Sequence, residues 1–408
     1  MVVEIGQRSE TVRRANLSAI VRELHARDPL SRSELVVRTG LTRSAIRGLV
    51  GELTAAGFVS EVRPAPLGTP GRPSPLVSLN PDSVVALVLE IAVDSLSAAV
   101  VGLNGRILEL IRVDRPAGHV SVEDIVGDLV ELATVVRARR PAGDREIGIG
   151  VAVVGVVRRI DGLVSMAPNL GWRDVPLGEQ LARAFGSDVP IYVANEADLG
   201  ALAEVRRGAA RGADHVLFIW GEVGVGGGLI IDGRPFTGVA GYAGEVGHLP
   251  VNPAGAACRC GSVGCWETEI GAGALLRRAG HPTGGGRAEV DAVLAEAAAG
   301  APVALGALEE TGRWIGFGIA GLVNVFNPRL VVLGGLLGRM YPFIRGILET
   351  GLERHALPAP RRIVRIVPAT LGVDAPLLGA GELAFEPLLA DPARWLRRGD
   401  TLTDRATA

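Results

Sequence analysis

The segment that decides the fold is Gly241–Glu267, with the sequence GYAGEVGHLPVNPAGAACRCGSVGCWE. It contains His248 and then all three cysteines of the chain, Cys258, Cys260 and Cys265. Three thiolates and one imidazole are the tetrahedral ligand set that structural zinc prefers. Buried free cysteines are the alternative, but that alternative does not explain a spacing that uses every cysteine. We therefore expect one structural Zn²⁺ in a closed site, with no open position for a catalytic water.

Two glutamates flank these metal ligands. Glu245 lies one turn before the histidine, and Glu267 follows the last cysteine by two residues. A bound metal would hold both near each other and near the segment that carries Asn195 and Glu196. Carboxylates, an amide and an imidazole together suit a polyhydroxylated ligand, whose hydroxyls need both donors and acceptors. Surface glutamates on an ordered loop are the alternative, and the spacing alone leaves both interpretations open.

The composition predicts a protein of two or three compact units. The chain has 408 residues and a formal net charge of −2, and all 42 basic residues are arginine. A nucleic-acid surface, if present, must therefore be local. No run of 18 apolar residues occurs, and the start of the chain, Met1–Ile5, lacks a charged-then-apolar export signal. We expect a cytoplasmic protein with no membrane contact, where reduced cysteines favour metal over disulfides.

The first sixty residues predict a winged helix-turn-helix. A helical apolar pattern ends before Pro29, a second short helix covers Ser31–Thr39, and Gly40 is placed to end it. A third helix is expected over 42–56, and residues 57–62 read as a turn and the start of a wing. Two short helices joined through a glycine turn are the sequence form of this DNA-binding motif.

The third helix is the expected recognition helix. Its apolar stripe leaves Thr42, Arg43, Ser44 and Arg47 facing outward in its first two turns, where such a helix meets base edges. Residues 1–63 hold ten arginines against seven acidic residues, a modest surplus that suits a dimeric DNA reader. A small helical protein-interaction module with solvated arginines is the alternative.

The next segment, residues 64–79, is rich in proline and glycine and is expected to form the wing tip or a linker. Within it, Gly71–Pro73 presents Arg72 on an extended backbone, which is the form of a minor-groove insert. An ordinary solvated linker arginine is equally consistent with the tripeptide.

The remainder of the chain alternates strands and helices, which predicts α/β layers. Val84–Val101 reads as an apolar strand pair with Asn104-Gly105 as a hairpin turn, and Gly224–Gly228 reads as a glycine loop. Residues 389–408 are expected to be a flexible tail. A helix is expected at 122–138, and strands at 147–157, 191–194, 216–220 and 229–231.

Four segments closely resemble the ROK family, named for repressors, open reading frames and kinases. They are GYAGEVGH with the cysteine run through Glu267, APNLGW at 167–172, NEAD at 195–198, and NPRLVVLGG at 327–335. The resemblance implies a two-lobe, actin-like α/β sugar-kinase fold (the ROK domain) over residues 80–388, with a zinc loop at 245–267. A winged-helix DNA-binding domain at residues 1–63 precedes it.

The resemblance also implies which residues act. Zinc ligands fall on His248, Cys258, Cys260 and Cys265. Sugar contacts fall on Asn169, Asn195, Glu196, Glu245, His248 and Glu267. His248 would then serve both, with one ring nitrogen on the metal and the other side of the imidazole facing the ligand.

Departures from the family's kinase pattern argue against an enzyme. Kinase members carry Asp-x-Gly-Gly-Thr in the first hairpin, where this chain has Glu90–Asp94, so side chains replace the glycines that cradle phosphate. Val223 stands where a threonine hydroxyl is expected in the second phosphate loop, whose remaining glycines can simply serve a tight turn. Glu196 occupies the position of the catalytic aspartate, and its longer side chain misplaces the carboxylate.

The sequence therefore predicts a repressor that responds to a sugar or sugar derivative and controls genes of carbohydrate uptake or metabolism. Its partners would be a double-stranded DNA operator and a second copy of the chain, in a homodimer or homotetramer. A ROK sugar kinase that phosphorylates a hexose with ATP is one alternative. A constitutive DNA-binding protein without effector is the other.

Overall fold

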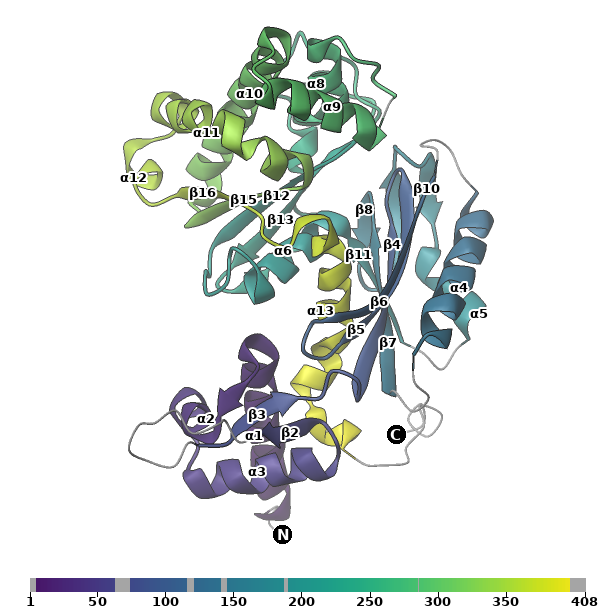
Figure 1. The fold of residues 1–408 in the computed structure, drawn as a ribbon, viewed down its shortest axis with the longest axis vertical. Helices are drawn as coiled ribbons and strands as arrows, with labels where there is room; N and C mark the ends of the chain where they lie inside the picture. Colours follow the sequence, from purple (N-terminus) through teal and green to yellow (C-terminus); the bar gives the residue numbers. More distant parts are fainter. Residues whose placement is uncertain are drawn as a thin grey trace.

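The computed structural model describes residues 5–62, 74–115, 121–140, 145–186, 190–284 and 286–396. Within them the chain forms an N-terminal unit and two α/β lobes (Figure 1). The N-terminal unit lies against the lower end of the first lobe in this view, and the second lobe lies at the opposite end of the molecule.

The N-terminal unit has three helices and a small antiparallel sheet. These are α1 (Ile5–Arg27), α2 (Arg32–Thr39), α3 (Arg43–Ala55), β1 (Leu30–Ser31), β2 (Val59–Val62) and β3 (Leu76–Leu79), with strand order β1-β3-β2. Ser31 and Glu34 form a reciprocal capping box at the start of α2, and Gly40 ends that helix at a left-handed φ of 70°. Thr42 then caps α3. The predicted winged helix-turn-helix is confirmed.

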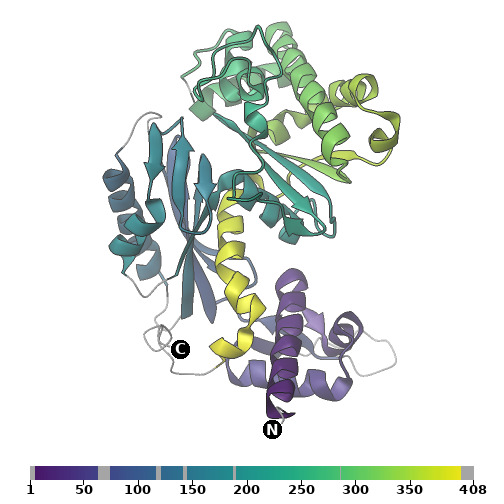
Figure 2. The same cartoon turned by 180° about the vertical axis from the view of Figure 1, so that it is seen from behind.

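The first lobe is built on a five-stranded sheet of order β11-β7-β4-β5-β6. Helices α4 and α5 cover one face, and α13 covers the other (Figures 1 and 2). A small sheet of order β10-β9-β8 extends it toward the second lobe. The elements are β4 (Val84–Ile91), β5 (Ser95–Gly102), β6 (Ile107–Asp114), α4 (Val122–Ala138), β7 (Arg145–Val153), β8 (Val156–Arg158), β9 (Leu163–Ala167), β10 (Trp172–Val175), α5 (Leu177–Phe185), β11 (Ile191–Asn195) and α13 (Ala375–Ala390).

The second lobe is built on a sheet of order β14-β13-β12-β15-β16. Its strands are β12 (Val216–Gly221), β13 (Val225–Ile231), β14 (Arg234–Pro235), β15 (Leu330–Gly334) and β16 (Arg365–Pro368). Its helices are α7 (Trp266–Ile270), α8 (Ala272–Ala279), α9 (Gly286–Ala298), α10 (Pro302–Phe326), α11 (Gly335–His355) and α12 (Pro358–Arg361). Single 3₁₀ turns lie at η1 (Val246–His248), η2 (Gly372–Asp374) and η3 (Pro392–Trp395).

The two lobes repeat one topology, which is the mark of the actin-like fold. In each sheet the central strand, β4 or β12, pairs antiparallel with the strand that follows it and parallel with a later strand. A further parallel strand closes the same side, β11 in the first lobe and β16 in the second. Helix α6 (Glu196–Arg207) leads from the first lobe into the second, and α13 returns and packs along it. The predicted two-lobe α/β fold is confirmed.

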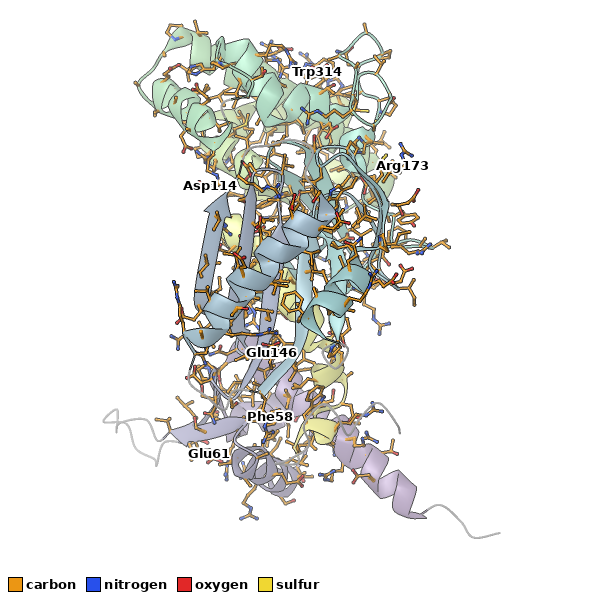
Figure 3. All side chains as sticks on the ribbon, turned by 90° about the vertical axis from the view of Figure 1, so that its right-hand side faces the viewer. Phe58, Glu61, Asp114, Glu146, Arg173 and Trp314 are labelled. Carbon is orange, nitrogen blue, oxygen red and sulfur yellow. The ribbon has the colours of Figure 1, made fainter. Side chains whose placement is uncertain are left out.

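One hydrophobic core joins the N-terminal unit to the first lobe. Buried residues of α1 such as Leu17 and Leu24 belong to the same cluster as Phe385 and Leu388 of α13 and the strand β4. Phe58, which precedes β2, lies in the side view below Glu146 of β7 (Figure 3). The N-terminal unit is therefore packed onto the first lobe as well as linked to it by the chain.

Several local expectations need correction. The expected strand at 147–157 is two strands, β7 and β8, because the chain turns at Gly155 with φ of 109°. The turn at Asn104-Gly105 joins β5 to β6, while β4 and β5 meet at Ala92–Asp94. The tail expected from residue 389 is wrong for 389–396, where α13 ends and η3 follows, because Leu389 is buried and Asp391 pairs with Arg14 of α1.

Within the described residues, no single helix has the length and apolar character needed to cross a membrane. Helices α9 and α10 meet those two criteria only when taken together, with a bend of 108° between them.

Candidate functional site

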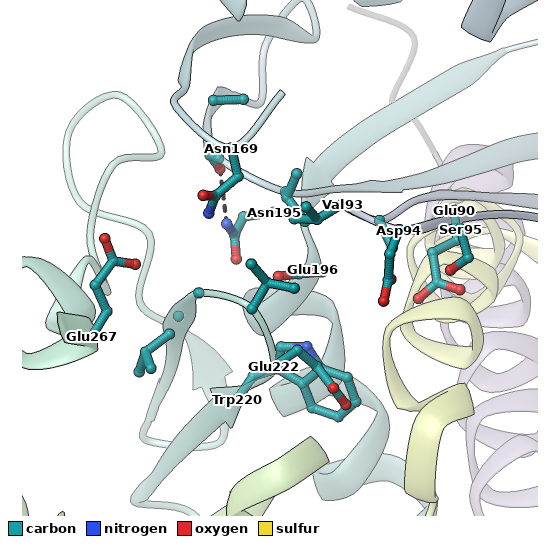
Figure 4. A pocket seen from close by; sticks show the side chains of 18 of the residues that line it. Glu90, Val93, Asp94, Ser95, Asn169, Asn195, Glu196, Trp220, Glu222 and Glu267 are labelled. Atoms are coloured by element: carbon teal, nitrogen blue, oxygen red, sulfur yellow. Dashed lines mark hydrogen bonds between the residues drawn. The ribbon is translucent and has the colours of Figure 1, made fainter. Parts of the chain in front are cut away.

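A cleft between the two lobes holds all the predicted sugar contacts. It encloses about 940 Å³, part of it open to solvent. Figure 4 shows Glu267 at one end and Asp94 at the other, with Glu196 between them. The residues that the fold brings to the cleft walls include the six predicted contacts, Asn169, Asn195, Glu196, Glu245, His248 and Glu267.

The two asparagines are held in place by other protein groups. Asn195 ends β11 and caps α6, because its Oδ1 accepts the N–H of Ala197 at 2.7 Å while its Nδ2 donates to the carbonyl of Gly155 at 2.8 Å. The Oδ1 of Asn169 accepts from the guanidinium of Arg259 at 2.8 Å. Both amides are oriented before any ligand binds, which lowers the entropy cost of binding.

Glu196 is the first residue of α6 and faces a group of carboxylates. Burial raises the pKa of Glu196 well above its usual value, and the charges of Glu90, Glu222 and Asp94 raise it further. Burial also raises the pKa of Glu222 to about 7. A buried carboxyl that keeps its proton near neutral pH can donate a hydrogen bond as well as accept one.

The imidazole of His248 lies between two carboxylates. Its Nε2 is 3.9 Å from Glu245 Oε2, and its Nδ1 is 3.7 Å from Glu267 Oε1. Burial raises the pKa of Glu245. The short turn η1 places Glu245 and His248 side by side at the cleft wall.

The predicted zinc ligands converge on one point. The Sγ of Cys258 lies 3.8 Å from His248 Nδ1, and those of Cys260 and Cys265 lie 3.7 Å apart. All four ligand atoms lie within 4.8 Å of one another. Zinc–sulfur bonds of about 2.3 Å in a tetrahedron separate two sulfurs by about 3.8 Å, so the ligand set fits the ion. The ring nitrogen Nδ1 lies toward the Cys258 sulfur, and Nε2 lies toward Glu245, which lines the cleft, as a double role of His248 requires.

At the opposite end of the cleft, side chains occupy the turn between β4 and β5. Residues Ala92–Asp94 form the turn between β4 and β5 and line the cleft with β-carbons and a carboxylate. Glu90 accepts hydrogen bonds from Ser97 at 3.0 Å and Arg112 at 3.3 Å. Because Arg112 also pairs with Asp374 at 3.1 Å, its charge is already shared by two carboxylates.

The glycines expected in a loop are largely inside a strand. Gly226, Gly227 and Gly228 belong to β13, where a β-carbon on each would approach other atoms closely. It would lie 2.5 Å from Ala201 of α6 at Gly228 and 2.7 Å from Val246 at Gly227. These glycines therefore allow β13 to contact both α6 and the turn that carries His248.

The N-terminal unit presents the expected DNA-reading residues to solvent. Thr42, Arg43, Ser44 and Arg47 are all exposed, while the opposite face of α3 is buried. Figure 1 shows α3 at the outer edge of the unit, away from both lobes. Arg72 lies outside the described residues.

Sequence reasoning missed several residues that surround the cleft or connect to it. Glu222 and Trp220 line the cleft at the end of β12, and Asp198 of α6 is buried with a pKa that burial raises to about 7. Asp198 is the last residue of the NEAD segment, so that motif could have predicted it as a site residue. His25 and Glu382, which pair between α1 and α13, carry no local signal because they are 357 positions apart.

A sequence profile of the ROK family matches residues 86–386. The chain is 27% identical to the xylose repressor of Bacillus subtilis (strain 168), over 93% of this chain and 97% of that protein. It is 32% identical to the glucokinase of Streptomyces coelicolor, over 73% of this chain and 97% of that enzyme.

Two solved structures share the architecture. A ROK family transcriptional regulator, described as a homologue of the E. coli MLC protein, superposes with a TM-score of 0.75 at 24% identity and covers 94% of this chain and 99% of its own. A glucokinase from Streptomyces griseus, in complex with glucose and AMPPNP, reaches 0.65 at 30% identity and covers 73% and 98%. The regulator-like matches extend over more of the chain than the kinase-like ones.

Proposed function

From the premise that this chain belongs to the ROK family, we propose that it is a sugar-responsive, DNA-binding transcriptional repressor. The observation that carries the proposal is the joining of a winged helix-turn-helix to a sugar cleft through one continuous core. The xylose repressor relatives, which match over the N-terminal unit as well, support it.

We propose further that the protein is not an enzyme. The side chains of Ala92, Val93 and Asp94 fill the turn where bare backbone would hold a phosphate. The side chains of Glu90, Asp94, Glu196 and Glu222 line that end of the cleft, where a nucleotide triphosphate would need free backbone N–H groups. A glucokinase remains the second candidate because of the 32% identity to such enzymes, and sugar-dependent ATP consumption tests it.

Helix α6 offers a route from the cleft to the DNA-binding unit. Its first residue, Glu196, lines the cleft, and its last residue, Arg207, reaches α1. Arg207 donates to the backbone carbonyl of His25 at 3.2 Å and pairs with Glu382 of α13. A sugar that draws the lobes together would move α6, which is a rigid helix. Because Arg207 at the end of α6 contacts α1, this movement would change the orientation of α3 relative to the first lobe.

This mechanism sets an energetic requirement. A ligand shifts the balance between two conformations only by its differential affinity for them. To release an operator fully, the sugar must favour the DNA-incompetent form by a few kcal/mol. The zinc in this proposal is structural: its four ligands hold the turn of Glu245 and His248 against the cleft.

The proposed DNA partner is a palindromic operator. Two copies of the chain, in a dimer or a dimer of dimers, would place Thr42, Arg43, Ser44 and Arg47 of each α3 in successive major grooves. Arg72 would extend into the minor groove beside them. The place of action is the cytoplasm, which holds the DNA and keeps the cysteine thiolates reduced.

Footprinting on sheared genomic DNA, repeated with a panel of sugars, tests the proposal. We expect discrete palindromic sites that one sugar releases or tightens. Arg47→Ala should weaken those sites at least 10-fold, while Arg313→Ala, an exposed arginine on α10, should leave them unchanged. Sites that no sugar affects, with no sugar-induced rise in thermal stability, would indicate a constitutive DNA-binding protein. The absence of specific sites would favour the alternative function, a sugar kinase.

A further inference from the structure

The end of the cleft opposite Glu267 is a second polar compartment. Glu90, Asp94, Glu222 and Trp220 line it, together with Arg112 and the exposed Arg287. Arg112 is already paired with Glu90 and Asp374, so the compartment keeps a surplus of hydrogen-bond acceptors. The compartment has a second feature besides these acidic side chains.

That second feature is the indole N–H of Trp220. The side chain is only 4% exposed, and its Nε1 has no hydrogen-bond partner among the described residues. Buried polar atoms without partners are rare, because the loss of their hydrogen bonds to water is then not compensated. Figure 4 shows this nitrogen on the side of the ring that faces Glu196.

The ring cannot turn away to find a partner. It stacks on Phe218 with centroids 6.0 Å apart, and a β-carbon on Gly334 would lie 2.6 Å from it. The donor is thus held rigidly at the cleft wall, among carboxylates that accept.

The chemistry of the compartment selects one kind of ligand group. The Trp220 N–H needs an acceptor, whereas the carboxyl oxygens of Asp94 need donors. A phosphate offers acceptors but no donors for the acidic side chains, and an ammonium offers donors but no acceptor for the indole. A hydroxyl group supplies both at once, and a ring that bears several hydroxyls satisfies the whole compartment.

We propose that this compartment is a second sugar subsite, so that the effector contains at least two linked sugar units. The first unit binds at Asn169, Asn195, His248 and the glutamates beside them, and the second unit donates to Glu222 and Asp94 and accepts from Trp220. The inference rests on the proposed sensor function and specifies its ligand: a neutral disaccharide or longer glycoside. The space that holds a nucleotide in a kinase would here hold sugar.

Titration calorimetry with the full-length protein tests this. The probes are xylose with xylobiose, and glucose with cellobiose, maltose and isomaltose, which vary the linkage. We expect one disaccharide to bind at least 10-fold more tightly than its monosaccharide. Trp220→Phe, which keeps the ring and removes the donor, should weaken that disaccharide about 10-fold and leave the monosaccharide unchanged. Trp314→Phe removes an indole N–H on α10, outside the cleft, and should change neither affinity.

Three results would overturn the inference in distinguishable ways. If a monosaccharide binds as tightly as its disaccharides and Trp220→Phe changes neither affinity, there is no second subsite. The proposed sensor function is not affected by that result. Binding of AMPPNP to the wild type would show that the compartment takes phosphate. If none of the six sugars binds while operator sites are still footprinted, the sensor function itself fails, and the subsite with it. Should Trp220→Phe fold poorly, Asp94→Ala, which removes an acceptor from the same compartment, gives the same discrimination in this assay.

Discussion

The imidazole Nε2 of His25 lies 2.7 Å from the carboxylate Oε2 of Glu382, with both side chains at least 97% buried. This pair joins α1 of the DNA-binding unit to α13 of the first lobe. Arg207 of α6 reaches the same carboxylate, and His25 Nδ1 contacts the carbonyl oxygen of Leu103. Three elements from distant parts of the chain therefore meet at one buried charge.

Glu382→Gln should destabilise the protein by about 3–5 kcal/mol, because it leaves the Arg207 charge buried without its partner. Chemical denaturation checks this. Glu386→Gln is the matched control one turn further along α13: its pair with Arg22 is largely exposed, so the loss should stay below about 1 kcal/mol. The Glu382 variant should also weaken the effect of the sugar on operator binding. Equal losses in the two variants would contradict a central role for this carboxylate.

The same carboxylate predicts an acid limit to stability. Burial tends to raise the pKa of Glu382, but the charges and hydrogen bonds of His25 and Arg207 prevail and lower it to about 2. A carboxyl whose pKa is lower when folded contributes stability above its unfolded pKa, near 4.5, and loses it as pH falls toward 2. Thermal melts from pH 6 to pH 2 should therefore show a decline below about pH 4.5 that is smaller in Glu382→Gln. Parallel declines in both proteins would be the contrary outcome.

The raised pKa of Glu222 predicts the opposite trend, a loss of stability at higher pH. Its pKa is raised to about 7, so its burial is tolerated while it is protonated, and the protein loses stability as pH rises from about 4.5 through 7. Glu222→Gln should match the wild type at pH 5 and be more stable at pH 8 by about 1–2 kcal/mol. Glu179→Gln, an exposed glutamate on α5, should change neither value. A variant that is less stable at pH 8 would show that the charged carboxylate is stabilised.

The proposed zinc ligands predict a metal-dependent fold in the cleft wall. Cys260→Ser should reduce bound zinc from one ion per chain to well below half and lower stability by an amount on the order of 4 kcal/mol. Atomic absorption and thermal unfolding measure the two effects, and a chelator should reproduce them in the wild type. Val263→Ala, an exposed position in the same loop, should retain both zinc and stability. Full zinc content in Cys260→Ser would remove that ligand from the site.

The close contact at Gly227 predicts a steric coupling between β13 and the proposed sugar site in the cleft. In Gly227→Ala the new methyl would meet Val246 at 2.7 Å and the carbonyl of Gly244 at 2.9 Å. Overpacking of this kind costs about 1–3 kcal/mol, and sugar affinity should fall at least 10-fold because Val246 lies between Glu245 and His248. Gly321→Ala has nothing within 4 Å and lies in α10, so it should be neutral or slightly stabilising. Unchanged sugar affinity in Gly227→Ala would argue against the coupling.

The sequence by itself determined what depends on neighbours in the chain. The capping box at Ser31, the glycine end at Gly40 and the N-cap at Thr42 are local hydrogen-bonding rules, so the helix-turn-helix could be predicted from them. Ligand spacing likewise predicted the convergence of His248 with the cysteines. The resemblance to a known family supplied the set of cleft residues, which spacing alone left open.

Only the tertiary structure decided what those residues face. The glycines of β13 were expected in a turn, but they make room for α6 and the His248 turn, and no local pattern encodes that contact. The unpaired N–H of Trp220 became visible only once its surroundings were known. The pairing of His25 with Glu382 joins residues 357 positions apart. Burial and charge pairing arise from contacts between distant segments, and these contacts set the pKa values and the chemistry of the cleft.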